Sequence, residues 1–150
     1  MKGFFSTLLF FLILLTGNVH AEEVIPYGDW TFVQGDSYKN IHTINQNNLE
    51  FGYSCSRDCI FYISPALVCQ MGKITDGWMI QSTGVGIKVK TMCVTNEDLQ
   101  VLKIYGRDEI IKILKSNQVI HFLINFDVQT NSLLSFDLVG FKDSYTRIEK

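Results

Sequence analysis

Four cysteines carry the most distinctive chemistry in this 150-residue chain: Cys55, Cys59, Cys69 and Cys93. Thiols could ligate zinc, exchange disulfides with a partner, or form structural disulfides. A Cys-x-x-Cys redox motif does not occur. Zinc is disfavoured because neither later cysteine has a close partner, and His42 and His121 stand at no ligand spacing. Disulfides are therefore the favoured interpretation, with no metal site.

The spacing of the cysteines favours one pairing among the three that four cysteines allow. Cys55 and Cys59 flank a tight turn, Ser56-Arg57-Asp58, between two strand-like runs. A hairpin there would bring their Cβ atoms within bridging range. Cys69 and Cys93 would then close a longer loop, which should stabilise the fold by about 3 kcal/mol, and the short loop by less.

The other polar residues form no recognisable catalytic group. Motifs for a nucleophile elbow, a phosphate loop and a metalloprotease are absent. His42 lies between two apolar positions of a strand-like run, with no carboxylate or nucleophile placed to work with it. His121 is interpreted as a surface or rim residue. We therefore predict a protein that is not an enzyme, without catalytic or cofactor-binding residues.

The amino-terminal segment has the pattern of a cleavable export signal, residues 1–21. Lys2 supplies a positive charge, and an apolar core runs from Phe4 to Leu15. This core is too short for a comfortable membrane span, and small residues ending at Ala21 suit signal peptidase. The alternative is an uncleaved anchor, which fits the short core less well. The signal predicts an exported, oxidised product, periplasmic or extracellular, formed by a single domain over residues 22–150.

Charge and hydropathy exclude two classes of partner for that product. Loss of Lys2 leaves 12 basic against 15 acidic side chains, a net charge of −3. This balance gives no basic surface for nucleic acid. No later segment approaches the ~20 apolar residues of a membrane span.

The rest of the chain contains nine strand-like runs, from which about eight short strands are expected, and one helix. Ile87 and Val89 alternate with Lys88 and Lys90, as on a sheet with one buried face. A helix is predicted to open after Gly106, with Asp108 as its N-cap, and a closing helical turn is expected within residues 140–147. The strand-like runs are Trp30–Val33, Ile41–Ile44, Leu49–Tyr53, Ile60–Ile63, Gly77–Ser82, Gly86–Lys90, Leu99–Tyr105, Val119–Phe126 and Leu134–Leu138.

These elements predict a mainly β fold: a small antiparallel β-sandwich or barrel-like sheet with one short helix, braced by disulfides. Aromatic residues are plentiful, and most are expected in the core. Tyr62 or Trp78 could instead form an exposed binding patch. Lys88 and Lys90 are interpreted as a solvated basic stripe.

The order of motifs resembles the invasion-associated locus B family of exported bacterial proteins. The resemblance rests on the signal segment, Gly28-Asp29-Trp30-Thr31, the cysteine pair, and the run Phe136-Asp137-Leu138-Val139-Gly140-Phe141. It departs from that family in having Gln34-Gly35-Asp36 where a cysteine is common, and in the close spacing of Cys55 and Cys59. The resemblance implies a Gram-negative periplasmic or outer-membrane-associated protein linked to host-cell interaction. It brings no catalytic residues.

Three functional hypotheses follow. The first is a non-enzymatic exported binding or accessory protein with an unknown protein partner. The alternative is a periplasmic inhibitor of a lysozyme-type hydrolase, with the loop Ser82–Gly86 entering the hydrolase cleft; a rigid scaffold would limit the entropy lost on binding. A hydrolase ranks last for want of an acid, a base and a nucleophile.

Overall fold

The computed structural model describes residues 22–64, 69–96, 99–125 and 131–150. The predicted signal, residues 1–21, therefore lies outside the described residues. Ten strands and two helices follow in chain order: β1 (Glu23–Tyr27), β2 (Trp30–Gln34), β3 (Lys39–Ile44), β4 (Glu50–Cys55), β5 (Cys59–Ser64), β6 (Ile74–Gln81), β7 (Gly86–Asn96), β8 (Leu99–Tyr105), α1 (Arg107–Ser116), β9 (Val119–Asn125), β10 (Asn131–Asp137) and α2 (Phe141–Ile148).

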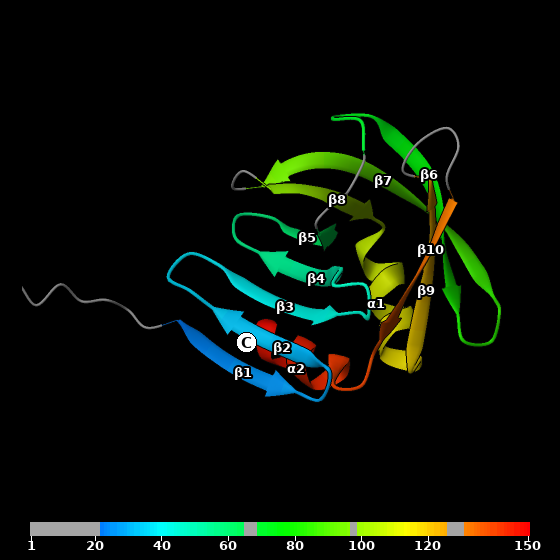
Figure 1. Ribbon diagram of the computed structural model, residues 1–150. Helices are drawn as coiled ribbons and strands as arrows, with labels where there is room; N and C mark the ends of the chain where they lie inside the picture. Colours follow the sequence, from blue (N-terminus) through cyan, green and yellow to red (C-terminus); the bar gives the residue numbers. More distant parts are fainter. Residues whose placement is uncertain (1–21, 65–68, 97–98, 126–130) are drawn as a thin grey trace, which may run out of the picture.

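All ten strands form one antiparallel sheet in the order β1-β2-β3-β4-β5-β8-β7-β6-β9-β10. The first five strands are a meander, and the next three run through the sheet in reverse chain order. The sheet curls until β10 approaches β3, so that it resembles an incompletely closed barrel (Figure 1). The prediction of a mainly β, barrel-like antiparallel sheet is confirmed.

The core lies on the concave side of the sheet, where the two helices also pack (Figure 1). Helix α2 contacts β1, β2 and β3. Both helices contribute buried residues, including Ile110 of α1 and Phe141 of α2. Aromatic rings dominate this core: Phe51 contacts Trp30, Phe61, Phe122 and Phe136, at ring-centroid distances of 5.0–5.9 Å. Of the two residues predicted from alternation to face inward on β7, Val89 is buried and Ile87 is partly buried against the core.

Both predicted disulfides are present. Cys55 and Cys59 are directly opposed across the β4–β5 hairpin, with 4.1 Å between their Cα atoms. Cys69 and Cys93 join the segment before β6 to the middle of β7, with 5.8 Å between their Cα atoms. No free cysteine is found in the described part of the chain, which contains all four.

The first hairpin and the last segment of the chain are joined by direct contacts. The Trp30 indole Nε1 donates to the Asp137 carbonyl at 3.0 Å, and the Asp29 amide donates to the Val139 carbonyl at 2.9 Å. Gly140 has a φ of +92°, and a Cβ there would collide with the Tyr27 carbonyl. Glycine is therefore required on two counts where the chain enters α2.

Two local predictions need correction. The N-cap of α1 is Gly106 in the left-handed region, with no side-chain cap hydrogen bond, and not Asp108. Asp108 lies in the first turn, where its charge complements the helix dipole. Strand β1 is an additional element, and the closing helical turn is the full helix α2.

Candidate functional site

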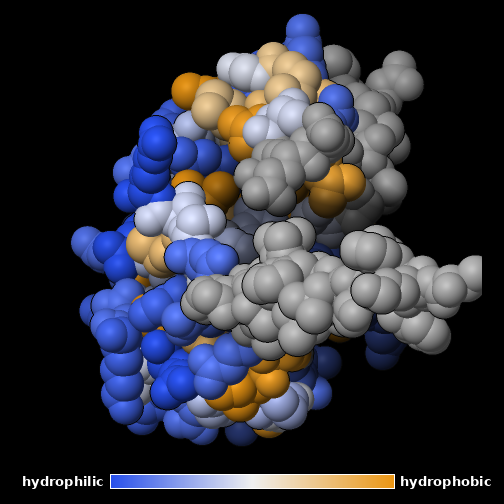
Figure 2. All heavy atoms as spheres, turned by 90° about the vertical axis from the view of Figure 1, so that its left-hand side faces the viewer, coloured by the Kyte–Doolittle hydropathy of each residue, from blue (hydrophilic) through white to orange (hydrophobic). Residues whose placement is uncertain are grey.

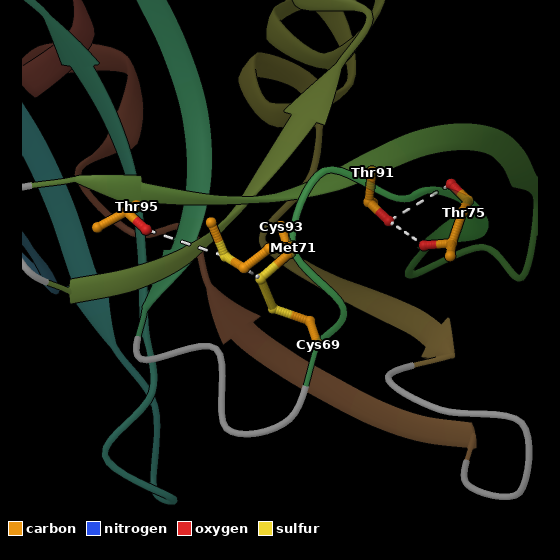
Figure 3. The surroundings of a disulfide bond; sticks show 6 residues. All are labelled: Cys69, Met71, Thr75, Thr91, Cys93 and Thr95. Carbon is orange, nitrogen blue, oxygen red and sulfur yellow. Dashed lines mark hydrogen bonds between the residues drawn. A yellow bond between two sulfur atoms is a disulfide. The ribbon is translucent and has the colours of Figure 1, made fainter.

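The Cys69–Cys93 disulfide fixes an exposed segment to the long strand β7 (Figure 3). Met71 forms an isolated bridge with Cys93, and its Sδ lies 3.5 Å from the Cys93 Sγ. The Met71 side chain is nevertheless half exposed. This disulfide therefore braces the segment before β6 against β7.

Two histidines, His42 and His121, lie within the described residues, on the separate strands β3 and β9. His42 is on the convex face of β3, opposite Thr31 and Gly52, and its buried Nδ1 has no hydrogen-bond partner. His121 pairs with Ser135 across β9 and β10, at 2.7 Å from Nδ1 to Oγ. Within the described ranges no group of three metal-binding side chains occurs. The one side-chain contact found for these two histidines is thus the His121–Ser135 pair.

A polar network covers the convex face of β3, β4 and β5. The Tyr62 hydroxyl donates to Glu50 and accepts from the Asn40 Nδ2, the latter at 2.9 Å. The ring lies over Gly52, where a Cβ would be 2.5 Å from its Cζ and Oη atoms. Burial raises the pKa of the Tyr62 phenol well above its usual value. Tyr62 is buried, so the expectation that it could form an exposed binding patch is wrong.

Trp78 is the aromatic residue that does face solvent, with 47% of its surface exposed. The sheet register places it opposite Leu123 of β9, and Leu123 opposite Leu133 of β10. Opposed residues in an antiparallel sheet point to the same face. We call Trp78, Leu123 and Leu133 the apolar row; it crosses three strands and ends at Leu133, which is 60% exposed.

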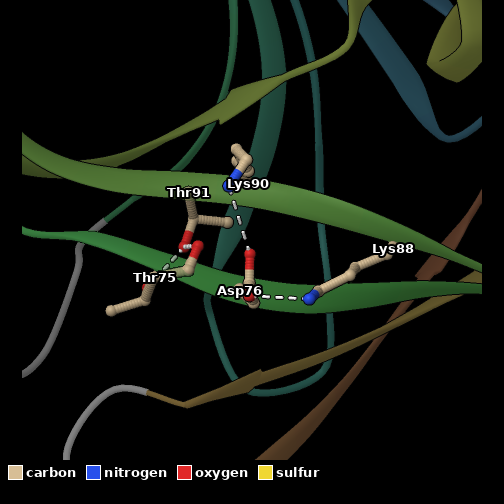
Figure 4. A network of polar contacts seen from close by, with 5 residues as sticks. All are labelled: Thr75, Asp76, Lys88, Lys90 and Thr91. Carbon is tan, nitrogen blue, oxygen red and sulfur yellow. Dashed lines mark hydrogen bonds and ion pairs between the residues drawn. The ribbon is translucent and has the colours of Figure 1, made fainter.

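Charged residues border the apolar row on β6 and β7, where Lys88 lies opposite Trp78 in the sheet register. Figure 4 shows the contacts of these charged residues. Asp76 lies between Lys88 and Lys90, with closest N–O distances of 2.8 and 3.6 Å. The hydrogen bond from Lys88 lowers the pKa of the Asp76 carboxyl. The predicted basic stripe is therefore partly neutralised by an acid on the neighbouring strand, which leaves a mixed polar border beside Trp78.

A cleft of about 320 Å³ lies at the other end of the apolar row, between β10 and the β3–β4 turn. Its walls include Leu133, Ser135 and Asp137 on β10 and the turn residues 44–47. Ile44, at 58% exposed, and Leu133 place two large apolar side chains in its lining. The apolar row on the convex surface of β6, β9 and β10 thus leads into this cleft.

The end of the molecule with the β2–β3 and β4–β5 turns has a different character. Figure 2 looks onto this end, where hydrophilic residues cover much of the visible surface and hydrophobic residues form separate groups. An open depression of about 430 Å³ lies beside the Cys55–Cys59 disulfide, lined largely by polar residues such as Gln34, Asp36 and Ser56. No buried charge or catalytic pair accompanies it in the described residues.

Sequence reasoning singled out Trp78 as a possible surface residue but missed Leu123 and Leu133. The available signal was in β10, where Leu134 and Phe136 share the inward face and the adjacent Leu133 must therefore point outward. The position of Trp78 beside Leu123 could not be named without the pairing of β6 with β9.

Comparison with known proteins shows the fold. No family model matches the sequence, and no curated protein matches it. Among solved structures, the fold is similar to that of invasion associated protein B from Bartonella henselae, with 13% sequence identity and a TM-score of 0.61. The match covers 85% of this chain and 96% of that one. The resemblance inferred from the motif order is therefore confirmed at the level of the fold.

Proposed function

We propose that this chain is an exported, non-enzymatic accessory protein that binds another protein through the convex face of β6, β9 and β10. The observation that carries the proposal is the apolar row with its half-exposed tryptophan. Contiguous apolar surface bordered by charge is typical of a protein-binding site, and tryptophan is frequent among residues that dominate binding energy. The expected partner surface is an apolar pocket able to accept an indole ring.

The two disulfides support the proposal that the protein is exported. Two disulfides use all four cysteines, and such bonds persist in oxidising compartments. The described helices include none long and apolar enough to cross a membrane. The similar Bartonella henselae protein is described as invasion associated, which supports host-cell interaction as the setting for this chain.

The test compares three forms of the oxidised protein, residues 22–150, immobilised and exposed to envelope and host-cell-surface extracts. Trp78→Thr removes the indole from an exposed strand position. Val24→Thr is the matched control, because Val24 is 56% exposed on the opposite edge strand β1. Bound proteins are identified by mass spectrometry and then titrated in purified form.

One stoichiometric partner that binds the parent and the Val24 control, but binds the Trp78 variant at least tenfold more weakly, is the expected result. A partner that binds all three forms equally would refute the assigned surface. Turnover of a substrate by the purified protein would refute the non-enzymatic assignment.

The β6–β7 hairpin favours one second candidate, a periplasmic inhibitor of a lysozyme-type hydrolase. Its tip, residues 82–85, is exposed throughout and includes Val85 at 57%. Figure 1 shows the hairpin extending past the neighbouring β9 and β10. Inhibition of a muramidase that is lost in Val85→Asp but kept in Trp78→Thr would select this candidate.

A further inference from the structure

Strand β10 is an edge of the sheet, with β9 as its one paired neighbour among the described strands. Two hydrogen bonds show which backbone groups of β10 point toward β9 and which point away from it. The Leu138 amide donates toward β9, to the Gln118 carbonyl, whereas the Asp137 carbonyl accepts from the Trp30 indole on the other side. Successive residues of a strand direct their backbone N–H and C=O groups to opposite sides, so Leu133 and Ser135 direct theirs to the same side as Asp137. Their N–H and C=O groups therefore face away from β9.

These outward-facing groups line the cleft against the β3–β4 turn. The opposite wall contains the amide side chains of Asn45, Gln46 and Asn47. The Asn45 Oδ1 accepts from two amides of its own turn, which fixes that wall. Gln46 and Asn47 are exposed. A cleft with a strand edge on one side and amides on the other matches the hydrogen-bonding groups of an extended polypeptide.

The two edges of the sheet differ in their protection. β1 contains Pro26, which cannot donate, and its Glu23 forms an ion pair with Arg147 of α2 at 3.0 Å. Proline and charge are common means of blocking strand addition. From Asn131 to Phe136, β10 contains no proline and no charged residue. The edge that ends the apolar row is thus the one left able to accept a strand.

We propose that β10 binds an extended segment of a partner polypeptide as an added antiparallel strand. This proposal rests on the proposed binding function and names the form of its partner. The segment's main chain would pair with Leu133 and Ser135, and an apolar side chain opposite Leu133 would extend the apolar row by one strand. Asp137 is the one charged side chain that lines the cleft in the described structure.

The charge of Asp137 selects among possible segments. In antiparallel pairing, the residue opposite Asp137 lies four positions before the residue opposite Leu133. A lysine or arginine there, followed four positions later by a large apolar residue, complements both ends of the edge. β10 itself contains no basic residue, so pairing with a second copy of β10 would leave Asp137 uncompensated. We therefore assign the edge to a different chain.

The test uses the oxidised protein, residues 22–150, and a short synthetic peptide. The peptide is rich in threonine and contains one leucine and, four positions before it, one lysine. NMR titration should show saturable binding with slowed hydrogen exchange at the Leu133 and Ser135 amides. Ser135→Pro removes one outward N–H without touching the ladder to β9, and should weaken binding at least tenfold. Ser135→Thr, which keeps the N–H, should bind like the parent.

A second reagent covers the case in which Ser135→Pro does not fold. The same peptide, N-methylated at the positions whose N–H groups would pair with β10, keeps every side chain and should lose binding to the parent protein. Equal binding of the methylated peptide, or protection that maps away from β10, would overturn the proposal. A dimer that is disrupted by Ser135→Pro would also overturn it, by assigning the edge to a second copy.

The two proposals fail separately. A natural partner that binds the parent and Ser135→Pro equally, but not Trp78→Thr, would leave the binding function standing and overturn strand addition. If no natural partner is retained while the probe peptide binds at β10, the edge assignment stands and the assigned binding function fails.

Discussion

At the scale of single residues, Gly52 shows how a missing side chain makes room for a buried phenol. We predict that Gly52→Ala lowers the free energy of unfolding by about 2 kcal/mol, because the new Cβ would displace the Tyr62 ring from its hydrogen bonds. Urea denaturation measures this. Gly86→Ala is the control, since its Cβ would meet Trp78 at 3.4 Å, an ordinary contact. Equal costs at the two glycines would contradict the prediction.

The buried tyrosines predict a loss of stability at alkaline pH. Burial, together with a hydrogen bond to Glu149, raises the pKa of Tyr145 to about 12, and burial also raises that of Tyr53. A raised pKa means that the folded state keeps the phenolic proton while the unfolded chain loses it, near pH 10. The contribution of the protonated Tyr145 phenol to the free energy of unfolding is therefore complete below about pH 10 and is lost as pH rises toward 12.

Urea denaturation across this pH range checks the prediction. Tyr145→Phe should show a shallower decline in unfolding free energy with pH than the parent, whatever its stability at neutral pH. Identical slopes would show that the Tyr145 proton does not report on folding.

At the scale of elements, the glycines that precede the two helices make a matched pair. Gly106 before α1 has a φ of +105°, and a Cβ added there would lie 4.0 Å from its nearest neighbouring atom, whereas at Gly140 the Tyr27 carbonyl occupies that space. Gly106→Ala should cost about 1 kcal/mol for the left-handed backbone alone. Gly140→Ala should cost at least about 3 kcal/mol more, or prevent folding, because it also displaces the β1–β2 turn.

Thermal denaturation of the two variants, followed by circular dichroism, measures the difference. Similar melting temperatures would mean that the carboxyl-terminal segment is not tightly held against the first hairpin.

The two disulfides should contribute unequally to stability. Removing Cys69–Cys93 by double serine substitution frees a loop with a sequence separation of 24 and should cost about 3 kcal/mol. Removing Cys55–Cys59, with a separation of 4, should cost less, since the β4–β5 hairpin already holds its ends. Urea denaturation of both double variants decides the order, and a larger cost for the short loop would reverse it.

Elements with a strong local pattern were predicted well, and elements defined by their neighbours were not. Ile87 and Val89 alternate with lysines and fall on the faces expected. Strand β1 was missed because Pro26 and the exposed Glu23 and Val24 resemble a loop; its pairing with β2 makes it a strand. The N-cap of α1 was misplaced because Gly106 caps by its backbone conformation, which a search for a capping side chain does not detect.

At the scale of the whole molecule, the apolar row could not be read from one sequence. Its three residues come from β6, β9 and β10. They meet because β6 and β9 are neighbours in the sheet, although β7, β8 and α1 separate them in the sequence. Such long-range pairing depends on the packing of the complete core. By contrast, both disulfides followed from local spacing, and Trp78 was one of two aromatic residues expected to be exposed, of which Tyr62 is buried.

The maturation of the whole chain gives a further prediction. Protein recovered after export should begin at or near Glu22, because the small residues ending at Ala21 suit signal peptidase. Amino-terminal sequencing tests the cleavage site, and the unreduced mass tests the two disulfides together. An intact Met1 on the exported protein, or four free thiols, would contradict the predicted maturation.

The contacts that tie Trp30 to Asp137 and Asp29 to Val139 also bear on the order in which the fold can be completed. In the export that we propose, strands β1 and β2 would emerge first from a translocation channel. Helix α2, which contacts both strands, would emerge last together with the segment before it. The short β4–β5 hairpin and its disulfide can form while later residues are still crossing. The amino-terminal hairpin, however, must wait for nearly the entire chain. We therefore expect premature termination before α2 to leave an aromatic surface uncovered and to make the product a substrate for envelope chaperones and proteases.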